Sequence, residues 1–180
     1  DYRSFWASQR NTGACREQFV LEAIWLTWVL GPFQEISCLK DKLTTLDTDI
    51  DDVYQMLVRL KRGAIGHLML DVLSRVPYRT GRFFGSDGII QWSLTDQQIR
   101  IYSVAEKRWR EFTESEDQVE AGYIHAERMY IDEMRHFINA LQGKEKWIYP
   151  LAEEREIQRA LEAADRSAKT GRHMKLENGD

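Results

Sequence analysis

The 180-residue sequence lacks the short motifs that mark the commonest enzyme sites. No GxGxxG or GxxxxGK[ST] occurs, so the chain carries no signature of a nucleotide-phosphate cradle. The GxSxG and HExxH patterns are also missing, which removes the usual signatures of serine hydrolases and zinc proteases. Gly85 and Gly88 stand between two predicted strands, a spacing typical of a hairpin turn.

Cysteine, excess positive charge and long apolar runs are scarce as well. Cys15 and Cys38 belong to no CxxC pair or Cys/His cluster, which favours free thiols over a disulfide or a zinc site. The formal net charge of −4, with both signs interspersed, argues against nucleic-acid binding. No uninterrupted apolar stretch approaches the roughly 20 residues that cross a membrane, so we expect a soluble, cytoplasmic protein.

The size of the chain, 180 residues and 21.2 kDa, fits one domain with a sizeable core. The sequence begins with Asp1 rather than Met and shows no start signal. We therefore expect a further segment to precede it.

Residues 13–31, GACREQFVLEAIWLTWVLG, predict a helix that is apolar on most sides and yet carries Glu17 and Glu22. Asn11 or Thr12 is expected to cap it, and Gly31 to end it. Glu17 in the first turn suits the helix dipole, which is a sufficient structural reason for its presence. Glu22 has apolar neighbours, so it needs a donor or an ion pair, for which the candidate partners are Arg3, Arg10, Arg16 and Arg75.

Alternating patterns predict a succession of short antiparallel strands at residues 33–39, 52–60, 64–74, 79–84, 89–93, 98–103 and 108–113. An acidic loop, ESEDQVEAG, follows these strands. A helix that includes Ile124 and ends at Gly143, and a last helix over about residues 152–169, complete the chain. This order predicts an α+β fold with a large, mostly antiparallel open sheet whose one face is covered by helices.

The uncovered face of that sheet would carry Val, Leu, Met, Phe and Trp at alternate positions. An exposed apolar face of this size predicts a partner surface. The four histidines, in contrast, are scattered, and a surface or structural position is favoured for His67, His125, His136 and His173. Arg75, after the strand LMLDVLSR, is a candidate anion contact, although such an arginine is usually only solvated.

Five segments in order resemble the C-terminal domain of the Gfo/Idh/MocA family of NAD(P)-dependent oxidoreductases, which includes glucose-fructose oxidoreductase and inositol dehydrogenase. The resemblance extends over the whole chain, and the segments that carry it are the helix from Thr12-Gly13 to Gly31, DVYQMLVRLKRGAIGHLMLDVLSR, FFGSDGIIQW, MYIDEMRHFINALQGK and RALEAADRSAKTGRHMKL.

The resemblance implies a dihydrodipicolinate reductase-like C-terminal domain that binds substrate and forms homo-oligomers through its open sheet face. It also implies that an N-terminal Rossmann domain, absent from residues 1–180, binds NAD or NADP and supplies a catalytic lysine. The family's first helix carries Asp and His one turn apart. Here Glu17 stands at the Asp position and Leu21 at the His position, and Leu cannot take a proton.

Two hypotheses follow from the resemblance. In the first, the chain is part of a sugar or cyclitol oxidoreductase and is inactive alone, with Glu17 and Glu22 as the catalytic candidates and Arg16 and Arg75 as substrate contacts. In the second, the chain is a non-catalytic oligomeric assembly module with a vestigial cleft. The hypotheses differ in whether Glu17 and Glu22 line a shared pocket.

Overall fold

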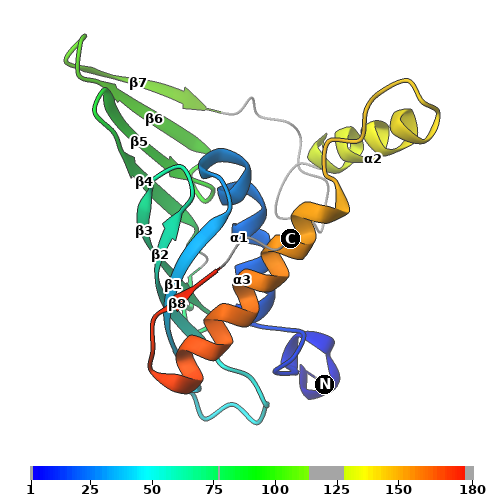
Figure 1. The fold of residues 1–180 in the computed structure, drawn as a ribbon. Coiled ribbons are helices and arrows are strands. Elements are labelled where there is room, and N and C mark those ends of the chain that lie inside the picture. Colours follow the sequence, from blue (N-terminus) through cyan, green and yellow to red (C-terminus); the bar gives the residue numbers. More distant parts are fainter. Residues whose placement is uncertain (1, 77, 114–127, 177–180) are drawn as a thin grey trace. The chain divides into compact units, whose positions relative to one another are not determined.

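The computed structural model describes residues 2–76, 78–113 and 128–176 (Figure 1). The chain divides into two compact units, residues 1–73 with 149–180, and residues 74–148. Both units contain helix and antiparallel strand, so the predicted α+β class is confirmed.

The first unit begins with two short 3-10 turns, Tyr2–Ser4 and Trp6–Ser8, followed by helix α1, Cys15–Leu30. Strands β1 (Phe33–Asp41), β2 (Val53–Leu60) and β3 (Ile65–Asp71) then form an antiparallel meander. Helix α3 (Leu151–Thr170) and the short strand β8 (Met174–Lys175) complete the unit, with β8 paired to β1. The resulting sheet has the order β3-β2-β1-β8.

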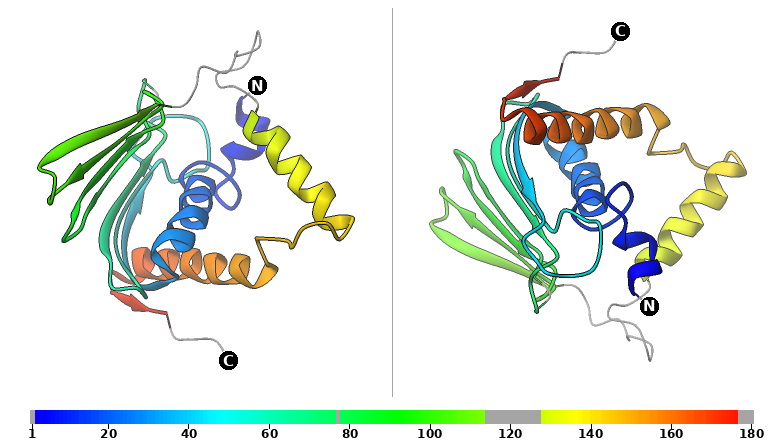
Figure 2. Two further views of the ribbon diagram at one scale, coloured as in Figure 1. Left: turned by 90° about the horizontal axis from the view of Figure 1, so that it is seen from above. Right: turned by 90° about the horizontal axis from the view of Figure 1, so that it is seen from below.

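Helices α1 and α3 pack against the same face of this first sheet and against each other (Figure 2). The core between these layers is formed by side chains that alternate along the strands and recur at helical spacing, including Phe19, Ala23, Ile36, Met56, Val58, Ile157, Leu161 and Ala164. The last helix, predicted over about residues 152–169, is therefore confirmed and packs in this core.

The second unit contains an antiparallel meander of its own. Its strands are β4 (Thr80–Phe84), β5 (Gly88–Ser93), β6 (Gln98–Ser103) and β7 (Arg108–Thr113), in that order. Helix α2, Arg128–Leu141, belongs to the same unit. Ile124 and His125 of the predicted helix lie outside the described residues. The successive strands are thus confirmed, and their hydrogen bonds divide them between two four-stranded sheets.

Gly31 and Gly143 end helices as predicted, and the backbone has a positive φ at both. Gly63 and Gly171 have a positive φ as well. The predicted cap of α1 is wrong. Ala14 occupies the N-cap position with φ 55° and makes no side-chain cap, while the Thr12 hydroxyl donates instead to the Trp6 carbonyl over 2.8 Å. The turn preceding α1 therefore uses the side chain that the helix was expected to use.

Within the described residues, no helix has both the length and the apolar character needed to cross a membrane. The same part of the chain contains no group of three His, Cys, Asp or Glu side chains placed to hold a metal ion.

Candidate functional site

Glu17 and Glu22 lie on different sides of α1. Successive helical residues are rotated by about 100°, so five residues separate their directions by about 140°. Glu17 shares an outward stripe with Leu21, Ile24 and Trp28, of which Leu21 is 51% and Trp28 78% exposed. Glu17 itself is half-buried at the start of this stripe. The two carboxylates therefore do not converge on one pocket from this helix.

Glu22 obtains a hydrogen bond from its own helix. The indole Nε1 of Trp25 donates to Glu22 Oε2 over 2.7 Å, one turn along α1. Three of the arginines considered as its partners bind aspartates: Arg3 pairs with Asp47, Arg10 with Asp49 and Asp51, and Arg16 with Asp165. An indole donor satisfies a carboxylate without burying a second charge.

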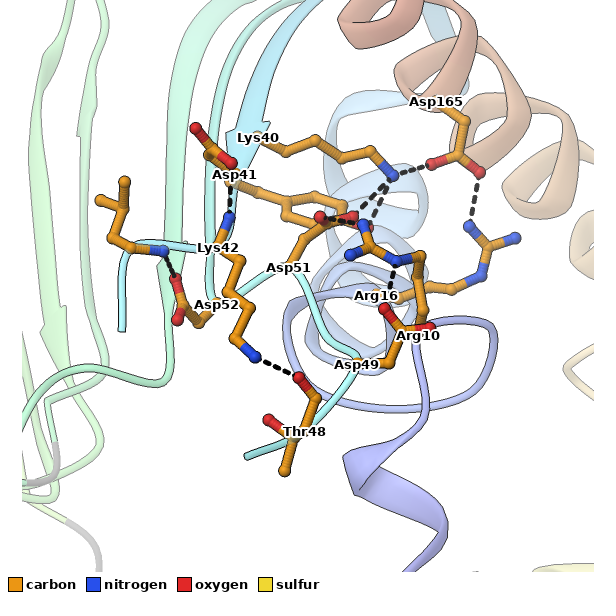
Figure 3. Close-up of polar contacts among 12 residues, drawn as sticks. Arg10, Arg16, Lys40, Asp41, Lys42, Thr48, Asp49, Asp51, Asp52 and Asp165 are labelled. Carbon is orange, nitrogen blue, oxygen red and sulfur yellow. Dashed lines mark hydrogen bonds and ion pairs between the residues drawn. The ribbon is translucent and has the colours of Figure 1, made fainter. Parts of the chain in front are cut away.

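Arg16 joins α1 to the rest of the first unit (Figure 3). Its Nη1 lies 2.5 Å from Asp165 Oδ2 on α3, and Lys40 Nζ on β1 lies 2.5 Å from the other oxygen of the same carboxylate. Lys40 also reaches Asp51 Oδ2 at 3.1 Å and the Tyr54 hydroxyl at 3.3 Å. Asp165 is therefore the point at which a helix and a strand are tied to α3.

The charges in this cluster shift one another's pKa. Burial would raise the pKa of Asp165, but hydrogen bonds from Lys40 and Arg16 outweigh it and hold the pKa below its ordinary value. Burial opposes the charged form of Lys40, yet its hydrogen bond to Asp165 and the surrounding negative charge raise its pKa. Burial raises the pKa of Tyr54 as well. The cluster thus remains ionised, with a neutral tyrosine beside it.

Sequence reasoning missed Lys40, Asp51 and Asp165 as a group. One local signal was available. Ile36 and Cys38, two residues apart on β1, are both buried in the core, and Lys40, two residues further along, lies on the same face of the strand. The pairing of a strand lysine with a carboxylate on the last helix is long-range, so it is visible only in the folded chain.

A second carboxylate in this region organises the loop between β1 and β2. Asp52 is fully buried and accepts hydrogen bonds from the amide of Leu43 (2.7 Å), the amide of Thr44 (2.9 Å) and the hydroxyl of Thr44 (2.6 Å). Burial raises the pKa of Asp52, but these donors outweigh it and leave the pKa below its ordinary value. The loop is therefore held at its start by a charged acceptor.

Gly13 is required by close packing. A Cβ built on it would lie 2.1 Å from the carbonyl oxygen of Ala7, which belongs to the turn before α1.

The two cysteines lie in the core, as free thiols, and burial raises the pKa of each to about 12. Neither thiol has the ionisation that a nucleophile needs near neutral pH.

The remaining sequence candidates are Arg75 and three of the histidines. Strand β3 ends at Asp71, so Arg75 stands four residues beyond it, exposed and in the second unit. His67 bonds Gln55 at 2.7 Å, His136 bonds Glu145 at 2.8 Å, and His173 bonds Ser37 at 3.0 Å. These three histidines have partners, which agrees with the structural positions favoured for them.

No protein-family model matches the sequence, and no curated protein is significantly similar to it. Many solved structures share its fold. An oxidoreductase domain protein from Kribbella flavida matches with a TM-score of 0.82 and 14% identity, over 97% of this chain and 53% of that one. Levoglucosan dehydrogenase in complex with NADH and levoglucosan matches with a TM-score of 0.80 and 16% identity, over 99% and 55%.

An oxidoreductase from Agrobacterium radiobacter, in complex with NAD+, L-tartaric acid and magnesium, matches with a TM-score of 0.80 and 13% identity, over 94% of this chain and 51% of that one. The chain thus spans about half the length of these structures. It has the fold of the C-terminal domain of Gfo/Idh/MocA-type oxidoreductases, as the resemblance in its sequence implied.

Proposed function

We propose that this chain is the substrate-binding and oligomerisation domain of an NAD(P)-dependent oxidoreductase that acts on a sugar or cyclitol. The observation that carries the proposal is the fold match, which includes nearly all of this chain and about half of structures that hold NADH or NAD+. Levoglucosan and L-tartaric acid, the small molecules in those structures, are both rich in hydroxyl groups. A polyhydroxylated substrate is the inference they support for this chain.

The cofactor is assigned to a separate Rossmann domain. The sequence contains no glycine-rich turn of the GxGxxG type, so its own residues do not fit the pyrophosphate of a dinucleotide. We therefore derive no chemical step at the nicotinamide from this chain. The isolated domain is expected to be inactive, and the choice between NAD and NADP lies with the other domain.

Glu17 is the residue of α1 best placed to meet a substrate. It is half-buried and heads the outward stripe of the helix, in its first turn. Its carboxylate would accept a hydrogen bond from a substrate hydroxyl, and the loss of that proton is the step that a general base assists. Leu21, one turn further, offers an apolar contact and no second proton acceptor.

Glu22, Arg16 and Arg75, the other site candidates, have different roles in this proposal. Glu22 faces another side of α1 and is held by Trp25, so it is the weaker catalytic candidate. Arg16 is engaged with Asp165, and we assign it to positioning α1 rather than to direct substrate contact. Arg75 is exposed and remains a candidate for contact with the substrate.

The oligomerisation proposal concerns the second sheet. On one of its faces, cross-strand neighbours form two apolar rows, Phe83-Ile90-Ile101 and Trp92-Ile99-Phe112. Ile99 is 46% and Phe112 51% exposed. An exposed apolar face built from adjacent strands fits a self-complementary contact between two copies. The outer face of the first sheet is more mixed, since Leu39, Leu57 and Met69 alternate there with polar side chains.

Calorimetric titration of NADH into the chain tests the assignment of the cofactor to another domain. The proposal predicts no saturable heat at cofactor concentrations up to about 1 mM, equivalent to binding weaker than about 4 kcal/mol. Saturable binding at micromolar concentration would overturn it. Two observations favour the alternative, a non-catalytic assembly module. Glu17 and Glu22 lie on different sides of α1, and leucine stands at position 21, where the resemblance expects histidine.

A further inference from the structure

An open pocket of about 660 Å³ lies in the first unit, and none of the residues that line it belongs to α1. One wall comes from residues 3–11, the turns that precede α1, and the other from residues 42–49, the loop between β1 and β2. Every residue that lines it is polar or charged. Such a lining disfavours apolar ligands, because an apolar ligand would displace water from these polar groups and offer them no hydrogen bond in return.

The two walls are joined by ion pairs. Arg3 Nη1 lies 3.2 Å from Asp47 Oδ2, and Arg10 Nε lies 3.0 Å from Asp49 Oδ1. An isolated parallel β-bridge between Gln9 and Asp49 adds a backbone link between the same segments. These cross-links hold the walls together before any ligand binds.

The first wall is also fixed to the body of the unit, and the second is braced by contacts within its own loop (Figure 3). Arg10 forms a second ion pair with Asp51, which is 7% exposed and bound in turn to Lys40. On the other wall, Lys42 Nζ donates to the carbonyl oxygens of Leu46, at 2.6 Å, and of Thr48. A pocket whose polar groups are already held in place loses less conformational entropy when it binds a ligand.

The charges in the pocket select among polar ligands. Arg3, Arg10 and Lys42 supply N–H donors, while Asp47 and Asp49 place acceptors beside the two arginines. A phosphate would meet both carboxylates at close range and be repelled by them. A sugar hydroxyl both donates and accepts, so it can bond to guanidinium and carboxylate together.

The uncharged groups point to the same class of ligand. Ser8, Gln9, Asn11 and Thr48 bring hydroxyls and amides to the lining. The Thr48 hydroxyl is shielded from solvent and has no hydrogen-bond partner among the described residues. A shielded hydroxyl without a hydrogen bond costs free energy, because it has lost its contacts with water. Rotation about χ1 would let this hydroxyl bond to a hydroxyl of the ligand.

We propose that this pocket binds a polyhydroxylated small molecule of monosaccharide size through the carboxylates and cations of its two walls. The inference goes beyond the proposed function, because none of the pocket residues lies on α1 and the ligand class follows from the lining alone. A saccharide held here is bound by residues other than Glu17.

The test is a titration of the ¹⁵N-labelled chain with D-glucose and, separately, with sodium phosphate, followed by NMR. We expect D-glucose to shift the amides of residues 8–11 and 47–49 in a saturable way, and phosphate to leave them unchanged. Asn11→Trp should fill the pocket and weaken D-glucose binding about tenfold or more, a loss of about 1.4 kcal/mol. Gln34→Trp, at an exposed position on β1, is the matched control and should bind D-glucose like the unmodified chain.

Three results would overturn the inference. The absence of saturable shifts would show that the pocket does not bind this class of ligand. Shifts as large with phosphate as with D-glucose would refute the selection by Asp47 and Asp49. Shifts confined to residues 16–22 would place the saccharide on α1. That result would refute binding in the pocket and support the proposed function, so the test distinguishes a failure of one proposal from a failure of the other.

Discussion

Arg16 Nη1 on α1 lies 2.5 Å from Asp165 Oδ2 on α3, although 149 residues separate them in the chain. The other oxygen of the same carboxylate binds Lys40 on β1. One aspartate therefore fixes α1, which carries Glu17, relative to both the sheet and the last helix.

Replacing Asp165 by Asn should lower the free energy of unfolding by about 2 kcal/mol, because it leaves Arg16 and Lys40 half-buried without their shared counter-charge. Urea unfolding measures the change. Asp132→Asn is the matched control, since it breaks an exposed ion pair with Arg135 and should cost less than about 0.5 kcal/mol. Equal effects of the two variants would contradict the assignment of Asp165 as a structural anchor.

The stability of the chain should fall in acid. The pKa values of Asp165 and Asp52 lie below their ordinary value in the folded state, so both aspartates stabilise the fold fully above the unfolded-state pKa of about 3.9. This contribution is lost as the pH falls through the folded-state pKa. Urea midpoints should therefore decrease as the pH falls below about 4, and the Asp165→Asn variant should show a shallower decrease. A pH profile of the variant parallel to that of the unmodified chain would count against this explanation.

Gly81 should not tolerate a side chain. A Cβ on this residue of β4 would lie 2.2 Å from Nε1 of Trp92, its cross-strand neighbour on β5. Gly81→Ala should therefore destabilise the second sheet by about 1–3 kcal/mol, measured from the unfolding of the chain. Gly66→Ala on β3 provides the comparison, because the nearest atom to its Cβ, Cγ2 of Val58, is 3.7 Å away. That variant should change stability by less than about 0.5 kcal/mol.

Ile99→Glu should separate the copies of the chain if the apolar face of the second sheet forms the proposed oligomer. Light scattering at micromolar concentration should report an oligomer for the unmodified chain and a monomer for Ile99→Glu, because a carboxylate in an apolar contact is costly. Gln91→Glu adds the same charge to the opposite face of that sheet and should leave the oligomer intact. A monomeric unmodified chain would refute this part of the proposal.

The fold was largely predictable because its signals are local. Gly31 and Gly171 end helices, and Gly63 with Lys61 and Arg62 forms the turn between β2 and β3, all through backbone preferences that a sequence displays. The division into two sheets was not predictable, since it arises where β3 and β4, consecutive in sequence, belong to different sheets, and no local pattern marks that point. The cap of α1 was mispredicted because Thr12 bonds to a turn that precedes the helix.

The site was less predictable than the fold. Glu17 and Glu22 were identifiable as carboxylates on an apolar helix, and their spacing already implies divergence. Which side of α1 faces outward became clear only with the helix in place against the sheet. The contacts among Arg16, Lys40 and Asp165 join three elements that are remote in sequence, and no local pattern predicts which residues of such elements meet.

The most direct test of the proposed function is the rate of NAD(P)H formation by a protein in which this domain is joined to its nucleotide-binding domain, assayed with sugars and cyclitols. We predict oxidation of at least one such substrate, a decrease in kcat/KM of about 100-fold or more for Glu17→Gln, and at most a few-fold decrease for Glu22→Gln. An active protein whose kcat/KM is unchanged by Glu17→Gln would contradict the assignment of Glu17, and the absence of any oxidation would favour the assembly module.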